Sequence, residues 1–413
     1  MKILDLPGGD ELYHYKKSLV LKFSGPRDVV STGPNNGGYR RDLTAVFNND
    51  CNPGGGMPCE IEAETYEKHM ELLASKQLGL DPRTCTGLST AAHMENAAIE
   101  CMKYEDFTVT AIVTAGINVN AVRVGDPTTW HERAGTYFEV MSGTINILLH
   151  IDADLAPGAL VNALVTCTEA KTAAIQELLA PSRYSHGLAT GSGTDGTIVV
   201  SNPESGVYLT NAGKHCKLGE YIGLVVKKAV KQALYNHCYM GPEYQHDILN
   251  RMDRFGITRD SLWERYQKLC QERQQPAGTR IDFMTCLDRI KRNNRLVTNT
   301  SLFAHLLDQM DWGMLGIEEV SEAAKQMLQL AGMPLQCWKS REEMLPEDDV
   351  AAKDVMEWLA DNYGNCLAEF ISVEKTPTFA SSESGLRMSD LPCQTLRENG
   401  LIENFVQKNN LSP

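Results

Sequence analysis

The sequence predicts an α/β N-terminal domain with a mixed sheet over residues 1–240, followed by a mainly α-helical C-terminal module over residues 241–413. Short apolar runs alternate with long helical patterns in the first part, whereas the second part shows almost only helical patterns. Gly241-Pro242, two helix-breaking residues after a long helical pattern, mark the predicted boundary.

Four apolar runs of the first part are expected to form strands, because they are rich in aliphatic and β-branched residues. They are Ser18–Phe23, Phe107–Thr114, Ile145–Ile151 and Thr197–Ser201. Three longer stretches have helical spacing of their apolar residues: Glu62–Gln77, Gly158–Leu179 and Leu218–Tyr235. Pro157 stands just before the second of these, near the first helical position, where proline is favoured.

In the second part, helices are expected near Arg259–Arg273, Ile317–Leu330 and Asp348–Asp361, and the small polar stretch Ala380–Gly385 is expected to be a loop. This part shows no internal repeat and no group of residues suited to catalysis. We therefore interpret residues 241–413 as an accessory module, or as one through which the chain forms a homo-oligomer.

Composition favours a small-molecule partner. The formal net charge is −14 and there is no run of Lys and Arg, which argues against nucleic acid or an anionic membrane surface. The start of the chain has no continuous apolar segment, and no later stretch reaches the roughly 18 apolar residues of a membrane span, so we expect a cytoplasmic protein. The 12 cysteines include no CxxC pair and are expected to be mostly reduced and buried.

The segment Gly191–Gly196 matches the pattern GxGxxG, which binds dinucleotides where it follows a strand and opens a helix. Here the expected strand Thr197–Ser201 comes after the motif instead. Without a helix N-terminus to receive a pyrophosphate, dinucleotide binding is disfavoured. Two interpretations stay open, a turn that faces a ligand with Thr194 and Asp195, and a plain connecting turn.

Small and polar residues follow several expected strands, where α/β domains commonly place their sites. His93 and Glu95 lie in one such stretch and could act as an acid/base pair, although His93 could equally be a structural histidine. A second stretch runs from Thr114 to Pro127. It includes Asn118 and Asn120, together with Arg123 and Asp126, which could equally form an ordinary ion pair.

Glu169 and Lys171 lie in the middle of an expected helix and point about 200° apart, so they cannot both face one cleft. We expect Glu169 to face the site, because the residues around it are small. His215 precedes the next helix and is a further candidate, with a structural role as the alternative.

Metal binding is poorly indicated. There is no HExxH and no paired CxxC, and His93, Glu95, His131, Glu132 and His215 show no diagnostic spacing. No cofactor is required by the sequence, and a divalent metal stays open. A serine-triad hydrolase is disfavoured because no GxSxG motif is present.

Taken together, these segments resemble the CbiZ family of adenosylcobinamide amidohydrolases. The resemblance runs from about Asp10 to Asn236. It is carried by the ordered segments Asn36-Gly37-Gly38, Ser89-Thr90-Ala91, Thr114-Ala115-Gly116, Asn118 to Asp126, Gly143-Thr144-Ile145-Asn146, Thr168 to Thr172, Ala189 to Asp195 and Gly213 to Glu220. It implies removal of the aminopropanol arm of a corrinoid, which yields adenosylcobyric acid for cobamide synthesis. Residues 241–413 have no counterpart in the resemblance.

Amide hydrolysis needs a base for water, donors for the oxyanion and an acid for the leaving amine. We expect Glu95 or His93 as the base, glycine-rich backbone with Asn120 or Asn146 as the donors, and His215 as the acid. The residues expected to contact the corrinoid are Asn36, Asn118, Asn120, Arg123, Asp126, Thr144, Asn146, Glu169, Thr190, Gly191, Thr194 and Asp195. Two alternatives stay open, a corrinoid carrier without activity and an amidase with Thr194 or Thr90 as nucleophile.

Overall fold

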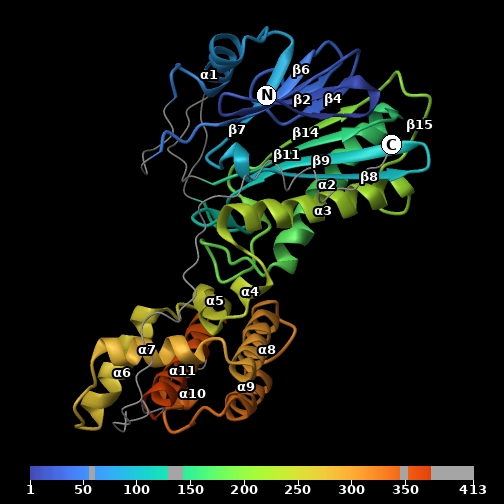
Figure 1. Cartoon of the computed structure of the whole chain (residues 1–413). Helices are drawn as coiled ribbons and strands as arrows, with labels where there is room; N and C mark the ends of the chain where they lie inside the picture. Colours follow the sequence, from blue (N-terminus) through green and yellow to red (C-terminus); the bar gives the residue numbers. More distant parts are fainter. Residues whose placement is uncertain (55–60, 129–142, 345–351, 374–413) are drawn as a thin grey trace, which may run out of the picture. The chain divides into compact units, whose positions relative to one another are not determined.

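The computed structural model describes residues 1–54, 61–128, 143–344 and 352–373 (Figure 1). The N-terminal part contains two mixed β-sheets. The smaller has the order β1-β2-β3-β6-β7, formed by Lys2–Asp5, Glu11–Tyr15, Ser18–Lys22, Ala45–Asp50 and Cys85–Thr90. The larger has the order β5-β4-β14-β11-β9-β8, formed by Gly38–Arg40, Asp28–Ser31, Gly196–Ser201, Ile145–Ile151, Phe107–Ala115 and Ala98–Tyr104.

Each sheet contains one parallel pair among antiparallel neighbours, β6 with β7 and β11 with β14. Two short ladders complete the strands. In the first, β10 (Ala121–Val122) pairs with β13 (Gly191–Ser192), and in the second, β12 (Asp154–Leu155) pairs with β15 (Tyr208–Leu209).

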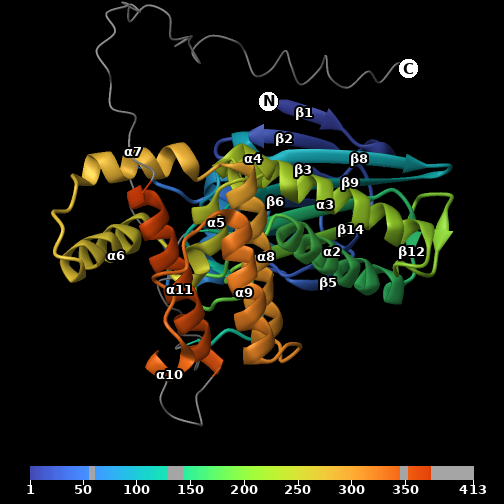
Figure 2. The ribbon, with the colours of Figure 1, turned by 90° about the horizontal axis from the view of Figure 1, so that it is seen from below.

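These elements form four layers, with the sheets in the middle and helices on both outer faces (Figures 1 and 2). Helices α2 (Pro157–Glu177) and α3 (Lys217–Cys238) cover the larger sheet and share one buried cluster with it. On the other side, α1 (Tyr66–Leu72) and the π-helical turn Leu73–Leu78 pack on the smaller sheet. The layer between the sheets has its own apolar cluster.

Strand alternation assigns each residue of β11 to a layer, because successive side chains point to opposite faces of a sheet. Ile147 and Leu149 join the cluster under α2 and α3, whereas Leu148 joins the cluster between the sheets. Asn146 and His150 are each two residues from Leu148, so their side chains point to the same face of the sheet as Leu148. The layer between the sheets is therefore apolar at its centre and polar at both ends of β11.

The described residues from Pro242 onward form helices joined by loops. The helices are α4 (Pro242–Gln245), α5 (Ile248–Met252), a short 3-10 turn (Asp253–Phe255), α6 (Arg259–Glu272), α7 (Arg280–Ile290), α8 (Asn294–Asp311), α9 (Ile317–Ala331), α10 (Arg341–Met344) and α11 (Ala352–Val373). Their buried side chains form a separate cluster between Ile248 and Ile371. Among the described residues, no helix combines the length and the apolar character that a membrane crossing requires.

The structure confirms an α/β region with mixed sheets followed by a helical region. All four expected strands exist, and none of their observed ends differs from the expected end by more than one residue. The helix expected from Glu62 begins later, because Thr65 caps it by accepting a hydrogen bond from the Lys68 backbone N–H at 3.2 Å. The helix expected to end at Asp361 continues to Val373, and the expected loop Ala380–Gly385 lies outside the described residues.

Candidate functional site

One end of the layer between the sheets carries a chain of buried side-chain amides. Asn146 Nδ2 donates to Asn48 Oδ1 at 2.8 Å and to the Ser89 carbonyl at 3.0 Å, and Asn48 Nδ2 donates to Thr114 Oγ1 at 2.8 Å. Asn48, Thr114 and Asn146 are buried. This chain ties β6 and β7 of the smaller sheet to β9 and β11 of the larger one. Both amide hydrogens of Asn146 are engaged, so this side chain fixes the site in place.

Asp50 and His93 form an ion pair at the same end. Asp50 ends β6, two residues after Asn48, and therefore shares its face of the strand. Its Oδ2 lies 2.9 Å from His93 Nδ1, and its Oδ1 accepts from the Asn52 backbone N–H at 2.7 Å. The Asp50 side chain is 3% exposed and the His93 side chain 51%. A buried carboxylate thus holds one ring nitrogen of a histidine whose ring stays accessible.

The glycine-rich segment is attached to the sheet by an ion pair between Lys171 of α2 and Asp195. Both side chains are nearly buried, and Asp195 also accepts from Ser192 Oγ at 2.6 Å and from the Ile145 backbone N–H at 3.0 Å. A Cβ added at Gly191 would stand 2.2 Å from Asp195 Oδ2. Glycine here leaves room for the ion pair, which an added Cβ would force to shift, and a strand follows the motif as expected.

Thr194 and Thr144 meet beside this ion pair. Their hydroxyl oxygens lie 2.7 Å apart, and Thr194 donates to the Gly143 carbonyl at 2.9 Å. Asn120 Nδ2 also donates to the Gly143 carbonyl. We call the group Asn48, Asp50, His93, Thr114, Asn120, Thr144, Asn146, Lys171, Thr194 and Asp195 the polar edge.

Two candidate carboxylates lie away from these contacts. Glu95 is 70% exposed and its Oε1 lies 3.8 Å from His14 Nε2, so the carboxylate paired with His93 is Asp50 and not Glu95. Glu169 pairs with Lys214 on the exposed side of α2, whereas Lys171 points toward Asp195. The two side chains diverge as the helix geometry predicts, but Lys171 is the one at the polar edge.

The loop after β10 is held by internal hydrogen bonds. Asp126 Oδ2 accepts from Ser182 Oγ at 2.6 Å and from the Arg123 backbone N–H at 2.9 Å. Burial raises the pKa of Asp126, but hydrogen bonds from Ser182 and Ser185 outweigh it and the pKa is lowered. Thr190 Oγ1 accepts from the Val124 backbone N–H at 2.9 Å. This loop supports the strand that carries Gly191.

Asn118 is exposed, and its carbonyl accepts from Arg183 Nε at 2.9 Å. Asn36 precedes β5 and contacts the start of β7, where its Nδ2 donates to the carbonyls of Pro82 and Cys85 at 2.7 and 2.8 Å. Because the polar edge is at the other end of β7, the structure does not bring Asn36 to it.

His215 precedes α3, which has 22 residues and therefore spans about 33 Å. The next two residues, Cys216 and Lys217, line a cavity of about 420 Å³ beside Tyr104 and Phe107. These aromatic residues lie where β8 and β9 meet, at the opposite end of β9 from Thr114. The structure therefore does not bring His215 to His93.

Asp50 and Asn48 are two functional candidates that the sequence reasoning missed. Both follow the apolar run Ala45-Val46-Phe47 of β6. A polar stretch after an apolar run is the same signal that drew attention to His93, and it could have identified them. The Asp50–His93 contact depends on the pairing of β6 with β7 across 43 positions, and the Asn48–Asn146 contact depends on the packing of the two sheets across 98 positions. No sequence pattern revealed either contact.

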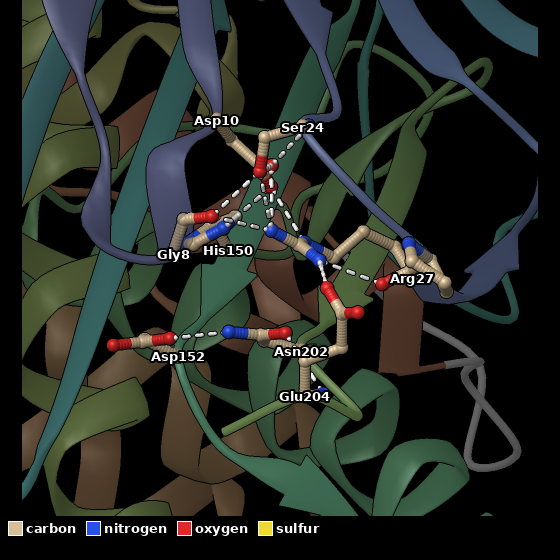
Figure 3. A network of polar contacts seen from close by, with 9 residues as sticks. Gly8, Asp10, Ser24, Arg27, His150, Asp152, Asn202 and Glu204 are labelled. Carbon is tan, nitrogen blue, oxygen red and sulfur yellow. Dashed lines mark hydrogen bonds and ion pairs between the residues drawn. The ribbon is translucent and has the colours of Figure 1, made fainter.

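A second buried polar cluster occupies the opposite end of the layer between the sheets (Figure 3). Arg27 donates to Asp10 through Nε and Nη2, both at 2.8 Å, and His150 Nε2 lies 3.1 Å from Asp10 Oδ2. All three side chains are fully buried. Burial raises the pKa of Asp10, but hydrogen bonds from His150 and Arg27 outweigh it, so the pKa is lowered. Because its three side chains are inaccessible to solvent, we interpret this cluster as structural: it links the smaller sheet, through Asp10, to the larger sheet, through Arg27 and His150.

Within residues 1–54, 61–128, 143–344 and 352–373, no three His, Cys, Asp or Glu side chains are placed to hold a metal ion. His131 and Glu132, considered above as ligands, lie outside the described residues.

Residues 3–242 match the family model of the adenosylcobinamide amidohydrolases, CbiZ. The chain is 30% identical over 231 residues to the adenosylcobinamide amidohydrolase of Methanosarcina mazei, covering 54% of this chain and 96% of that protein. It is 33% identical over 236 residues to the uncharacterized protein MJ1613 of Methanocaldococcus jannaschii, covering 54% of this chain and 88% of that protein.

Among solved structures, the PH0078 protein from Pyrococcus horikoshii OT3 is similar at a TM-score of 0.29 and 12% identity, covering 61% of this chain and 88% of that one. The family model matches more than half of the chain, and the polar edge lies entirely inside the matched residues. The chain therefore belongs to the adenosylcobinamide amidohydrolase family, CbiZ, and is a hydrolase that acts on an amide.

Proposed function

We propose that this chain hydrolyses the amide between the corrinoid and its aminopropanol arm, which converts adenosylcobinamide to adenosylcobyric acid and aminopropanol. The product would re-enter cobamide synthesis, so the reaction would serve corrinoid salvage. The observation that carries the proposal is the Asp50–His93 pair, with Asp50 Oδ2 2.9 Å from His93 Nδ1. It supplies the proton transfer that amide hydrolysis requires.

The pair is suited to this role because each member has a separate task. Asp50 holds Nδ1 and thereby fixes the ring and its tautomer, which leaves Nε2 to exchange a proton with the reacting groups. Since half of the His93 side chain is exposed, a substrate can reach it.

The rest of the polar edge supports this pair and offers polar contacts to a wide, amide-fringed corrinoid. Asn48 and Asn146 fix β6 and β7 against the larger sheet, so that Asp50 is rigidly placed. Thr144 and Thr194 place two hydroxyl groups beside one another at the same edge. Thr194 donates to the Gly143 carbonyl and Thr144 donates to Thr194, so the remaining lone pairs of the two hydroxyl groups can accept hydrogen bonds from the amide side chains of a corrin ring.

The first test is the product. Incubation of the purified full chain with adenosylcobinamide, followed by mass spectrometry of the corrinoid, is expected to show loss of the aminopropanol arm. Tight binding with an unchanged corrinoid mass would instead identify a carrier. A covalent adduct on Thr194 or Thr90 would indicate a threonine nucleophile.

The second test separates the two carboxylates that could serve His93. His93→Gln and Asp50→Asn are each expected to lower turnover by about 100-fold or more, because they remove the ring that transfers a proton or the group that orients it. Glu95→Gln is expected to leave turnover nearly normal, because Glu95 is exposed and faces His14. The opposite order, with Glu95→Gln inactive and Asp50→Asn active, would contradict the proposed role of Asp50.

A further inference from the structure

A second histidine, His237, reaches the polar edge from α3. Its ring packs on Gly116, directly after β9, so closely that a Cβ at Gly116 would stand 2.8 Å from His237 Nε2. Because glycine has no side chain, the His237 ring can pack against the backbone at this position. The preceding residue, Asn236, donates from Nδ2 to the Asn96 carbonyl at 3.2 Å, and this bond attaches the last turns of α3 to the short helix after His93.

The surroundings of His237 favour its neutral form. Burial lowers the pKa of His237, and the positive charge of His93 lowers it further. Within the described structure, His237 Nδ1 is buried and has no hydrogen-bond partner. Histidines near a helix C-terminus are usually stabilised in the charged form, and here burial outweighs that effect.

The acidic groups on the neighbouring elements are paired with other residues. Asp50 holds His93, Glu95 faces His14, and Glu100 of β8 pairs with Lys228 at 2.8 Å. The two histidines therefore sit in contrasting environments, one beside a buried carboxylate and the other desolvated. Such a contrast separates the roles of acid and base at a single site.

We propose that His237 is the proton acceptor for the attacking water and that His93, held by Asp50, is the proton donor for the leaving amine. This inference rests on the proposed function. Water oxygen forms a bond to the amide carbon while its proton passes to His237. The C–N bond then breaks as the His93 imidazolium gives its proton to the departing aminopropanol nitrogen. The products are a carboxylic acid and an amine, and exchange with solvent restores both rings.

The activity test is a pH profile of kcat/KM for the full chain. The wild-type profile is expected to rise with pH as His237 loses its proton, because only the neutral ring can accept a proton from water. His237→Gln is expected to lower turnover by about 100-fold or more and to remove the acid limb, which a merely structural role would not do. Gly116→Ala, which displaces the ring without removing it, should lower turnover as well.

The matched control is His69→Gln. His69 is also buried with a pKa lowered by burial, but it lies on α1 and its Nδ1 accepts from the Glu62 backbone N–H at 3.1 Å. Its loss is expected to lower the melting temperature and leave the pH profile unchanged. A direct measurement complements this control, because NMR titration of the His237 ring should give a higher pKa in His93→Gln than in the wild type, through removal of the neighbouring charge.

The outcomes separate the two proposals. An active wild type in which His237→Gln and Gly116→Ala retain normal turnover and the acid limb of the profile would refute the role of His237 and leave the proposed function standing. A wild type that binds the corrinoid and leaves its amide intact would contradict both.

Discussion

The ion pair between Lys171 and Asp195 illustrates how single residues shape the polar edge. A nearly buried ion pair is stable only when further hydrogen bonds offset the loss of solvation, and Ser192 and the Ile145 backbone provide them. The pair thereby holds Thr194 beside Thr144. Gly191 is part of this arrangement because any side chain there would occupy the position of the Asp195 carboxylate.

Gly191→Ala tests this constraint. The added Cβ would stand 2.2 Å from Asp195 Oδ2 and 2.8 Å from Lys171 Nζ, so the ion pair has to shift. We expect a loss of about 1–3 kcal/mol in the free energy of unfolding, together with reduced turnover. The control is Gly193→Ala in the same turn, where no atom lies within 4 Å of the added Cβ. Denaturant unfolding of both variants measures the difference, and equal stability would show that the pair does not need the glycine.

Residue identity alone could not decide which side of α2 faces the polar edge. Helix geometry correctly separated Glu169 from Lys171, but the choice between them required the position of Asp195, which lies across a strand and a loop. The choice of His93 needed only the polar stretch after an apolar run. Its partner Asp50 could not be predicted, because the contact depends on parallel pairing of β6 with β7.

At the scale of elements, β11 connects the two polar clusters. Asn146 at its start and His150 near its end face the same layer, with Leu148 between them. The strand was predicted from its apolar composition. The seven-residue run is buried throughout, so hydrophobicity could not show that its two polar residues face another sheet. Strands β1, β2, β4, β5, β6, β7 and β8 of the two sheets were not predicted, nor were the short strands β10, β12, β13 and β15. The polar residues at the end of β6 interrupt its apolar run, which explains why this strand was not recognised.

The Asp10 cluster predicts how the sandwich responds to acid. The folded-state pKa of Asp10 lies below its usual range, so its contribution to stability is present above about pH 4 and is lost as pH falls through the lowered value. Asp10→Asn leaves Arg27 buried without its carboxylate and is expected to cost about 3–5 kcal/mol near pH 7.

Chemical denaturation between pH 7 and pH 3 measures this effect. The wild type should lose stability toward low pH more steeply than Asp10→Asn, so that the two curves converge. A constant difference between the two proteins over the whole range would show that the ionisation of Asp10 does not contribute. Asp5→Asn is the matched control, because Asp5 is exposed and pairs with Lys2 at the surface.

At the scale of the whole molecule, the buried clusters fall on either side of Gly241. The three clusters of the sandwich contain residues between Leu6 and Met240, and the helical cluster contains residues between Ile248 and Ile371. Each region therefore has apolar side chains enough to form its own core, as expected for parts of this length. The match to the amidohydrolase family also ends at residue 242, and the polar edge lies before it.

From this separation we predict that residues 1–240 fold alone and retain measurable amide hydrolysis. Circular dichroism and a cooperative thermal transition would establish folding, and mass spectrometry of the corrinoid would establish activity. The control is the full chain at equal concentration, with sedimentation of both proteins to test whether residues 241–413 mediate self-association. If the fragment folds but is inactive at every concentration, the helical region contributes to the site and the proposed division is wrong. If the fragment is active and monomeric while the full chain self-associates, the helical region is the oligomerisation module. The chemistry then needs only the sandwich, whereas assembly needs the helices.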